Sequence, residues 1–155
     1  MTAKTAPSRF AYFDTSALVK RYVNEAGRQQ VLQLLRRHEC VASAVLTVEI
    51  RSALRRRAAE GTLDAARVPE ILGRIAADRE YWTLVGVGSE VLRAAETLVA
   101  NHPLRTLDAI HVASAQLFAA RTSSPHLLFV SADMRQTEAA TAIGLTVRLI
   151  GSVVQ

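Results

Sequence analysis

The sequence predicts an α/β fold of three layers, in which helices cover both faces of a central, mainly parallel sheet of about five strands. Short, mostly apolar runs alternate along the chain with longer segments whose apolar residues repeat with the period of a helix. Half of the residues are apolar but only 5% are aromatic, so the core must consist mainly of Ala, Val, Leu and Ile. Such a composition is usual where helices pack on a sheet.

The predicted strands are short and mostly apolar, as strands covered on both faces should be. They span residues 10–14, 40–44, 83–87, 127–131 and 146–150. Helical segments separate them, so we expect the strands to run parallel.

The predicted helices occupy the stretches between these strands. They span residues 16–22, 25–38, 47–60, 63–80, 90–101, 107–121 and 133–143. Pro69 interrupts the fourth of them, and proline removes a backbone donor and clashes with the preceding turn. We therefore expect a kink there, or two helices in place of one.

The length and composition bound the class of protein. A chain of 155 residues has the usual size of one domain, so we expect a single domain over residues 1–155, with residues 1–8 as a flexible N-terminal extension. The one cysteine, Cys40, cannot form an internal disulfide, and the scattered histidines lack the spacing of a zinc site. The sequence shows neither a signal peptide nor a long apolar stretch, so we expect a cytoplasmic protein with no membrane contact.

The charge balance is compatible with a nucleic-acid partner. The formal net charge is +5, and clustered cations release counterions from nucleic acid when they bind it. A GC-rich genome would also produce the excess of Arg over Lys, so the charge alone does not decide the function.

Two carboxylates follow predicted strands directly. Asp14 closes the run Phe10 to Asp14, and Asp133 comes two residues after the strand that ends at Ser131. Ligands of open parallel sheets bind beyond the carboxyl ends of the strands. We therefore expect Asp14 and Asp133 to face a common crevice.

Two further acids lie on helix faces that should be buried. Glu49, in the first turn of its helix, borders an apolar stripe, and Asp108 has Leu104 and Val112 at positions i−4 and i+4. An unpaired charge there is costly, because desolvation favours the neutral form of a carboxyl group. Several carboxylates without basic partners are best compensated by a hard divalent cation, Mg²⁺ or Mn²⁺.

Each acid also has a purely structural interpretation. Asp133 is a possible N-cap with Gln136 as its capping-box partner, and Asp14 is a possible cap of the helix that starts at Ser16. Glu49 would be favoured by the helix dipole. Asp108 is the hardest to explain in this way, since the dipole does not account for its place on the apolar face.

Four segments together resemble the PIN domain and, within that family, the VapC-type toxins of bacterial toxin–antitoxin pairs. No segment is specific alone, but their order and separation form a strong combined signal. They are 12–20 (YFDTSALVK), 42–50 (ASAVLTVEI), 104–113 (LRTLDAIHVA) and 130–145, which begins VSAD. Met134 and Gln136 depart from the basic or apolar residues expected after the fourth acid.

The resemblance implies a metal-dependent endoribonuclease with one acidic pocket for Mg²⁺ or Mn²⁺. It implies that Asp14, Glu49, Asp108 and Asp133 are the catalytic and metal-binding acids, with Asp14 and Asp108 holding the principal ion. It further implies that Thr15, Ser16 and Ser131 support them. Water would attack in place of the ribose 2′-hydroxyl, leaving 3′-hydroxyl and 5′-phosphate ends. His111 is interpreted as a packed or supporting residue, since metal-bound water needs no separate imidazole.

The resemblance also implies partners: an RNA substrate, a cognate antitoxin that covers the groove and a second copy of the chain in a homodimer. Apolar residues of the early helices, such as Val19, Tyr22 and Val31, are candidates for the dimer surface or equally for the core. The candidate RNA contacts are Arg105, Arg135, Lys20 and Arg21. The cluster Arg51, Arg55, Arg56 and Arg57 could bind RNA, contact a partner or only be solvated.

Two other interpretations compete with this one. A phospho-receiver domain also gathers acids around Mg²⁺, but it should have an acidic pair after the first strand and a Lys near a late one. Here Thr15 follows Asp14, and the last 20 residues contain no Lys. The other alternative is a PIN-like binding module without catalysis, which metal-dependent cleavage would exclude.

Overall fold

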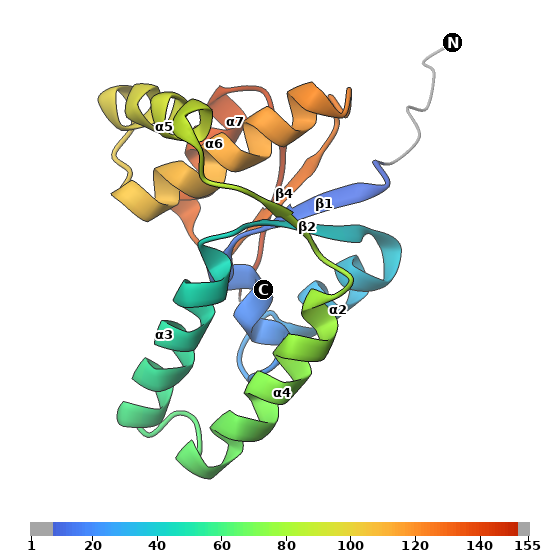
Figure 1. The fold of residues 1–155 in the computed structure, drawn as a ribbon, viewed down its shortest axis with the longest axis vertical. Helices are drawn as coiled ribbons and strands as arrows, with labels where there is room; N and C mark the ends of the chain where they lie inside the picture. The colour runs from blue at the N-terminus through green and yellow to red at the C-terminus, as the bar shows by residue number, and fades with distance from the viewer. Residues whose placement is uncertain (1–7, 152–155) are drawn as a thin grey trace.

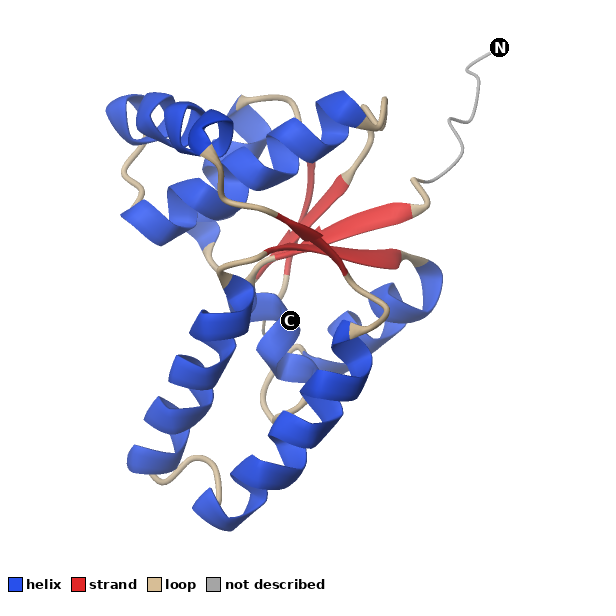
Figure 2. Cartoon of the chain, in the orientation of Figure 1, coloured by secondary structure: helices blue, strands red, loops and turns tan. Residues whose placement is uncertain are grey.

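Within residues 8–151, five strands form one parallel sheet, in the order β3-β2-β1-β4-β5. Figure 2 shows the strands in red. The structure is a computed structural model that describes residues 8–151, so the expected N-terminal extension lies outside the described residues except for Ser8. The strands are β1 (Phe10–Phe13), β2 (Glu39–Ser43), β3 (Thr83–Val85), β4 (Leu128–Ser131) and β5 (Thr146–Leu149). The predicted α/β class and parallel sheet are confirmed.

Helices cover both faces of the sheet and complete the three layers (Figure 1). They are α1 (Thr15–Leu18), α2 (Arg28–Arg37), α3 (Leu46–Ala59), α4 (Val68–Arg79), α5 (Ser89–Asn101), α6 (Thr106–Arg121) and α7 (Met134–Ala142). Helices α5, α6 and α7 lie on one face, and α1 to α4 on the other. None of the helices within residues 8–151 is long and apolar enough to cross a membrane.

Alternation along β1 divides the core into two clusters. Ala11 and Phe13 pack with α1 to α4, whereas Tyr12 points to the opposite face and packs under α5 and α6. From Ala11 to Phe13 the strand is fully buried on both faces, which explains its continuous apolar run. Val19 and Val31 also belong to the first cluster, so they are core residues and not a dimer surface.

The structure corrects the ends of two helices. Helix α2 begins at Arg28, three residues later than expected, because its N-cap Gly27 has a φ of 88°. In the segment 63–80, where a kink or two helices in place of one were expected, the structure has two helices. A 3₁₀ turn at Ala65–Arg67 precedes α4, and Pro69 lies in the first turn of α4, where its missing N–H costs no hydrogen bond.

The last strand differs from the expectation that each strand is covered on both faces. β5 is an edge strand, and Thr146, Arg148 and Leu149 are exposed. Its apolar pattern alone does not distinguish an edge from the centre of the sheet.

The order of the strands places the functional end of the sheet. β1 lies in the centre, with β2 on one side and β4 on the other, so the chain leaves β1 and β4 at a topological switch point. Ligands bind at such points, beyond the carboxyl ends of the strands. The helices that follow β1, β2 and β4 begin there, and their N-termini favour negative charge.

Candidate active site

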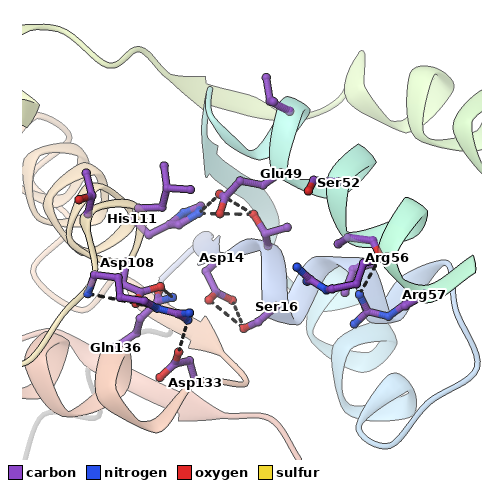
Figure 3. A pocket seen from close by; sticks show the side chains of 17 residues that line it. Asp14, Ser16, Glu49, Ser52, Arg56, Arg57, Asp108, His111, Asp133 and Gln136 are labelled. Atoms are coloured by element: carbon purple, nitrogen blue, oxygen red, sulfur yellow. Dashed lines mark hydrogen bonds and ion pairs between the residues drawn. The ribbon is translucent and has the colours of Figure 1, made fainter. Parts of the chain in front are cut away.

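A cleft of about 730 Å³ opens at this end of the sheet, and all four predicted acids line it (Figure 3). Asp14 comes from the end of β1, Glu49 from α3, Asp108 from α6 and Asp133 from the residue before α7. These segments are far apart in the sequence and come from both helical layers. The structure therefore brings the four acids into one cleft, as the strand-end and helix-face patterns predicted.

Asp14 is the buried centre of the cleft, with 1% of its surface exposed. It caps α1 by accepting a hydrogen bond from the Ala17 N–H at 3.0 Å. The Ser16 hydroxyl lies 2.8 Å from both carboxylate oxygens, and the Ser131 hydroxyl donates to Oδ2 at 2.8 Å. Burial raises the pKa of Asp14 above its usual value, although these hydrogen bonds act in the opposite direction.

The two serine hydroxyls are oriented by backbone groups. Ser16 Oγ accepts from the Ala132 N–H and Ser131 Oγ accepts from the Asp133 N–H, both at 2.9 Å. Because these acceptor positions are occupied, each hydroxyl is left to donate its proton toward Asp14. The predicted supporting residues thus prepare the Asp14 position for a carboxylate and not for an amide.

Glu49 lies in the first turn of α3, where it accepts hydrogen bonds from two neighbours. The Thr15 hydroxyl donates to Oε1 at 2.9 Å, and His111 Nε2 lies 2.5 Å from the same oxygen. Burial acts to raise the pKa of Glu49, but the hydrogen bonds from His111 and Thr15 act in the opposite direction, and the pKa lies below its usual value. His111 is 1% exposed and contacts the cleft through Glu49.

Asp108 is buried at the start of α6, as its apolar neighbours predicted, with 8% of its surface exposed. The backbone N–H and the Nε of Arg105 donate to Oδ2 at 3.3 and 3.2 Å. Gln136 Nε2 donates to Oδ1 at 3.0 Å. Asp108 therefore caps its helix and faces the cleft at the same time.

Asp133 is an N-cap, as its structural interpretation proposed, because it accepts from the Arg135 N–H at 2.8 Å. The expected capping box with Gln136 does not form, since the Gln136 amide reaches Asp108. Oδ2 of Asp133 lies 4.0 Å from a terminal nitrogen of Arg105. Arg105 thus contacts both Asp108 and Asp133. Capping and exposure to the cleft are compatible at this position.

The oxygen ligands of the cleft fit a hard divalent cation, although each carboxylate is hydrogen-bonded to different protein groups. Within residues 8–151 no three His, Cys, Asp or Glu side chains are close enough to hold one ion together. Each acid is held by protein donors instead, as described above. The lining offers carboxylate oxygens and the buried Gln136 Oε1, which lacks a hydrogen-bond partner in the described part of the chain. Oxygen ligands of this kind are those that Mg²⁺ and Mn²⁺ prefer.

Only one of the four basic residues predicted to contact RNA lines the cleft. Arg105 lines the cleft, whereas Arg135 does not. Lys20 pairs with Glu25 at 3.2 Å, and Arg21 pairs with Asp78 at 2.7 Å, bordering a separate hollow. Lys20 and Arg21 are therefore outside the cleft, because they lie on a 3₁₀ turn that packs against α2 and α4.

Arg56 is a cleft residue that the sequence analysis did not single out from its cluster. It lines the cleft together with Arg57, but Arg57 donates to Glu25 at 2.9 and 3.0 Å. Within residues 8–151 the guanidinium of Arg56 has no hydrogen bond or ion pair. The spacing contained this signal, since Arg56 lies seven residues, or two helical turns, after Glu49 on α3.

The PIN domain family matches residues 11–141. This chain belongs to that family. The resemblance of the four segments is thus confirmed. Over 139 residues the chain is 35% identical to Ribonuclease VapC35 of two Mycobacterium tuberculosis strains, CDC 1551 / Oshkosh and H37Rv, covering 88% of this chain and 93% of the relative.

Solved structures support the fold. A toxin–antitoxin complex from Klebsiella pneumoniae matches with a TM-score of 0.63 and 17% identity, covering 88% of this chain and 95% of the other. VapBC2 from Rickettsia felis, bound to a DNA fragment from its promoter, matches with a TM-score of 0.62 and 9% identity, covering 91% and 98%. At these identities the likeness establishes the three-layer architecture shared with PIN proteins.

Proposed function

We propose that this chain is a metal-dependent endoribonuclease that hydrolyses RNA phosphodiester bonds and is the toxin of a bacterial toxin–antitoxin system. The observation that carries the proposal is the convergence of Asp14, Glu49, Asp108 and Asp133 on one cleft at the switch point of the sheet. The 35% identity to a ribonuclease over most of the chain supports the substrate class.

The cofactor of this reaction is Mg²⁺ or Mn²⁺. Asp14 and Asp108 would hold the principal ion, with Glu49 and Asp133 completing its environment. The bound ion would make a water more acidic and neutralise phosphoryl charge, which phosphodiester hydrolysis requires. The protein's own contribution is to hold the acids, since Ser131 orients Asp14 and Gln136 orients Asp108. The products are 3′-hydroxyl and 5′-phosphate ends.

Arginines that line the cleft, Arg56 and Arg105, are the candidate contacts of the RNA backbone. Arg56 lies on α3 and Arg105 is the N-cap of α6, and both line the cleft. Arg105 is engaged with two acids, so Arg56 is the more available phosphate contact. Guanidinium groups bind phosphate through paired hydrogen bonds.

A cognate antitoxin is the expected protein partner, within a complex that also contains a homodimer of this chain in the cytoplasm. One of the similar structures is a toxin–antitoxin complex and another is VapBC2, which supports this assignment. Two exposed apolar side chains line the cleft, Val48 at 72% and Leu107 at 43% exposed, and Met134, 60% exposed, follows Asp133 in the chain. An antitoxin segment would bury these residues and place a basic side chain among the acids.

The alternatives differ in what they predict for RNA. Membership of the PIN family removes the phospho-receiver interpretation. A catalytically idle binding module remains the competing hypothesis. It predicts binding of a partner without metal-dependent cleavage.

The test is cleavage of total cellular RNA by purified protein with Mg²⁺, with Mn²⁺ or with EDTA. Asp14→Asn is the inactive variant, because an amide cannot replace the carboxylate toward which Ser16 and Ser131 donate. Glu70→Gln is the matched control, since Glu70 is exposed on α4 outside the cleft. Discrete metal-dependent fragments, lost in Asp14→Asn and kept in Glu70→Gln, would support the nuclease. Identical RNA in every lane would favour the binding module.

A further inference from the structure

A buried chain of hydrogen bonds runs from the core of the sheet to the cleft. The Tyr12 hydroxyl lies 2.8 Å from His111 Nδ1, and His111 Nε2 lies 2.5 Å from Glu49 Oε1. Tyr12 is fully buried and His111 is 1% exposed, so water does not compete for these contacts. The residues come from β1, α6 and α3, and no role in the proposed reaction has so far been assigned to Tyr12.

Two partners of fixed role set the direction of the hydrogen bonds: the Ser43 N–H at one end can only donate, and the Glu49 carboxylate at the other end can only accept. The backbone N–H of Ser43 donates to the Tyr12 hydroxyl oxygen at 3.1 Å. With this acceptor position occupied, the hydroxyl proton is available for His111 Nδ1. A neutral imidazole that accepts at Nδ1 carries its proton on Nε2. That proton points at Glu49 Oε1.

Packing holds both rings in place for this geometry. The Tyr12 ring stacks on Phe129, with centroids 5.4 Å apart and planes 6° from parallel. The His111 ring meets Tyr12 edge to face at 6.0 Å. At the other end, Glu49 Oε1 accepts from both His111 and Thr15. Within residues 8–151, Oε2 of Glu49 has no hydrogen bond and is left for the cleft.

We propose that Tyr12 is a positioning residue of the nuclease site, which holds His111 as its Nε2–H tautomer and, through it, the carboxylate of Glu49. The catalytic part of this inference rests on the proposed function. The tautomer itself does not, because it is a property of the folded protein.

Tyr12→Phe is the informative substitution, since it removes the hydroxyl and keeps the ring that stacks on Phe129. The matched control is Tyr22→Phe. Tyr22 is also buried, at 2% exposed, and its hydroxyl also has a side-chain hydrogen-bond partner, the carboxylate of Asp78, but outside the cleft. Thermal unfolding of both variants checks that each is folded.

Nitrogen-15 NMR of the imidazoles, without added metal, tests the tautomer directly. His111 is assigned by the loss of its signals in His111→Asn. We expect a protonated Nε2 and an unprotonated, hydrogen-bonded Nδ1 in the native protein at neutral pH. In Tyr12→Phe the Nδ1 signal should move to the position of a free acceptor, and in Tyr22→Phe it should stay. A proton on Nδ1 in the native protein would overturn the proposal.

Kinetics test the consequence for the reaction. Tyr12→Phe should lower kcat about 10–100-fold, as loss of the groups that orient metal ligands does, with KM for RNA unchanged. Tyr22→Phe should keep the native kcat. In the His111→Asn background Tyr12→Phe should have little further effect, because Tyr12 acts through His111. Additive losses, or equal losses in both tyrosine variants, would refute the positioning role. Absence of cleavage by the native protein would refute the nuclease and leave the tautomer result standing.

Discussion

Arg56 offers a quantitative test of how RNA enters the cleft. Its guanidinium lines the cleft and has no partner within residues 8–151, whereas Arg55 on the same helix is exposed outside the cleft. If Arg56 binds one phosphate, Arg56→Ala should weaken binding and make it less dependent on salt. Arg55→Ala should change neither property and serves as the matched control.

The expected change in the salt dependence of RNA binding follows from the loss of one phosphate contact. For single-stranded nucleic acid each contact contributes about 0.7 to the slope of log affinity against log salt. Between 50 and 200 mM salt, a fourfold change, native binding should therefore fall by a factor about 2.6 larger than that of the variant. The affinity difference between the two proteins should be greatest at low salt.

The assay is fluorescence anisotropy with a labelled single-stranded RNA in EDTA, so that no cleavage interferes, over a series of KCl concentrations. Thermal unfolding should show the same stability for both arginine variants, because neither guanidinium has a partner in the described part of the chain. Equal salt slopes for native protein and Arg56→Ala, or an equal loss in Arg55→Ala, would contradict the assignment of Arg56 as a phosphate contact.

Two further predictions concern stability. Gly27→Ala should destabilise the fold by about 2–5 kcal/mol in urea unfolding. The backbone of Gly27 is in the left-handed region, and an added Cβ would also overlap with the side chain of Ile150. Gly144→Ala should cost only about 1–2 kcal/mol, because its φ is also positive but no atom lies within 4 Å of the added Cβ; equal costs would disprove the overlap. Burial acts to raise the pKa of Asp78, but hydrogen bonds, that of Arg21 first, outweigh it and lower the pKa. The stabilisation of the fold by ionised Asp78 is therefore present above the pKa of the unfolded state, about 3.9, and is lost as pH falls through the lower pKa of the folded state. Asp78→Asn should flatten the acid side of a plot of urea midpoint against pH, and an unchanged acid side would rule this out.

The sequence by itself determined the elements and the acids. Strands and helices differ in the period of their apolar residues, and that period is a local property of the chain. Asp14 and Asp133 were found because an acid after a buried strand is unusual, and Asp108 because its helical neighbours are apolar. Each of these signals lies within a few residues of the side chain concerned.

The tertiary structure alone decided which side chains meet. Tyr12 and His111 are 99 residues apart, and Gln136 reaches Asp108 across 28 residues. Lys20 was expected at the mouth of the cleft, but it pairs with Glu25 because the chain turns there onto α2. Such contacts depend on the order of the strands and on how the helices pack on them. No local pattern contains that information, because the apolar residues of a strand do not specify which strand or helix lies beside it.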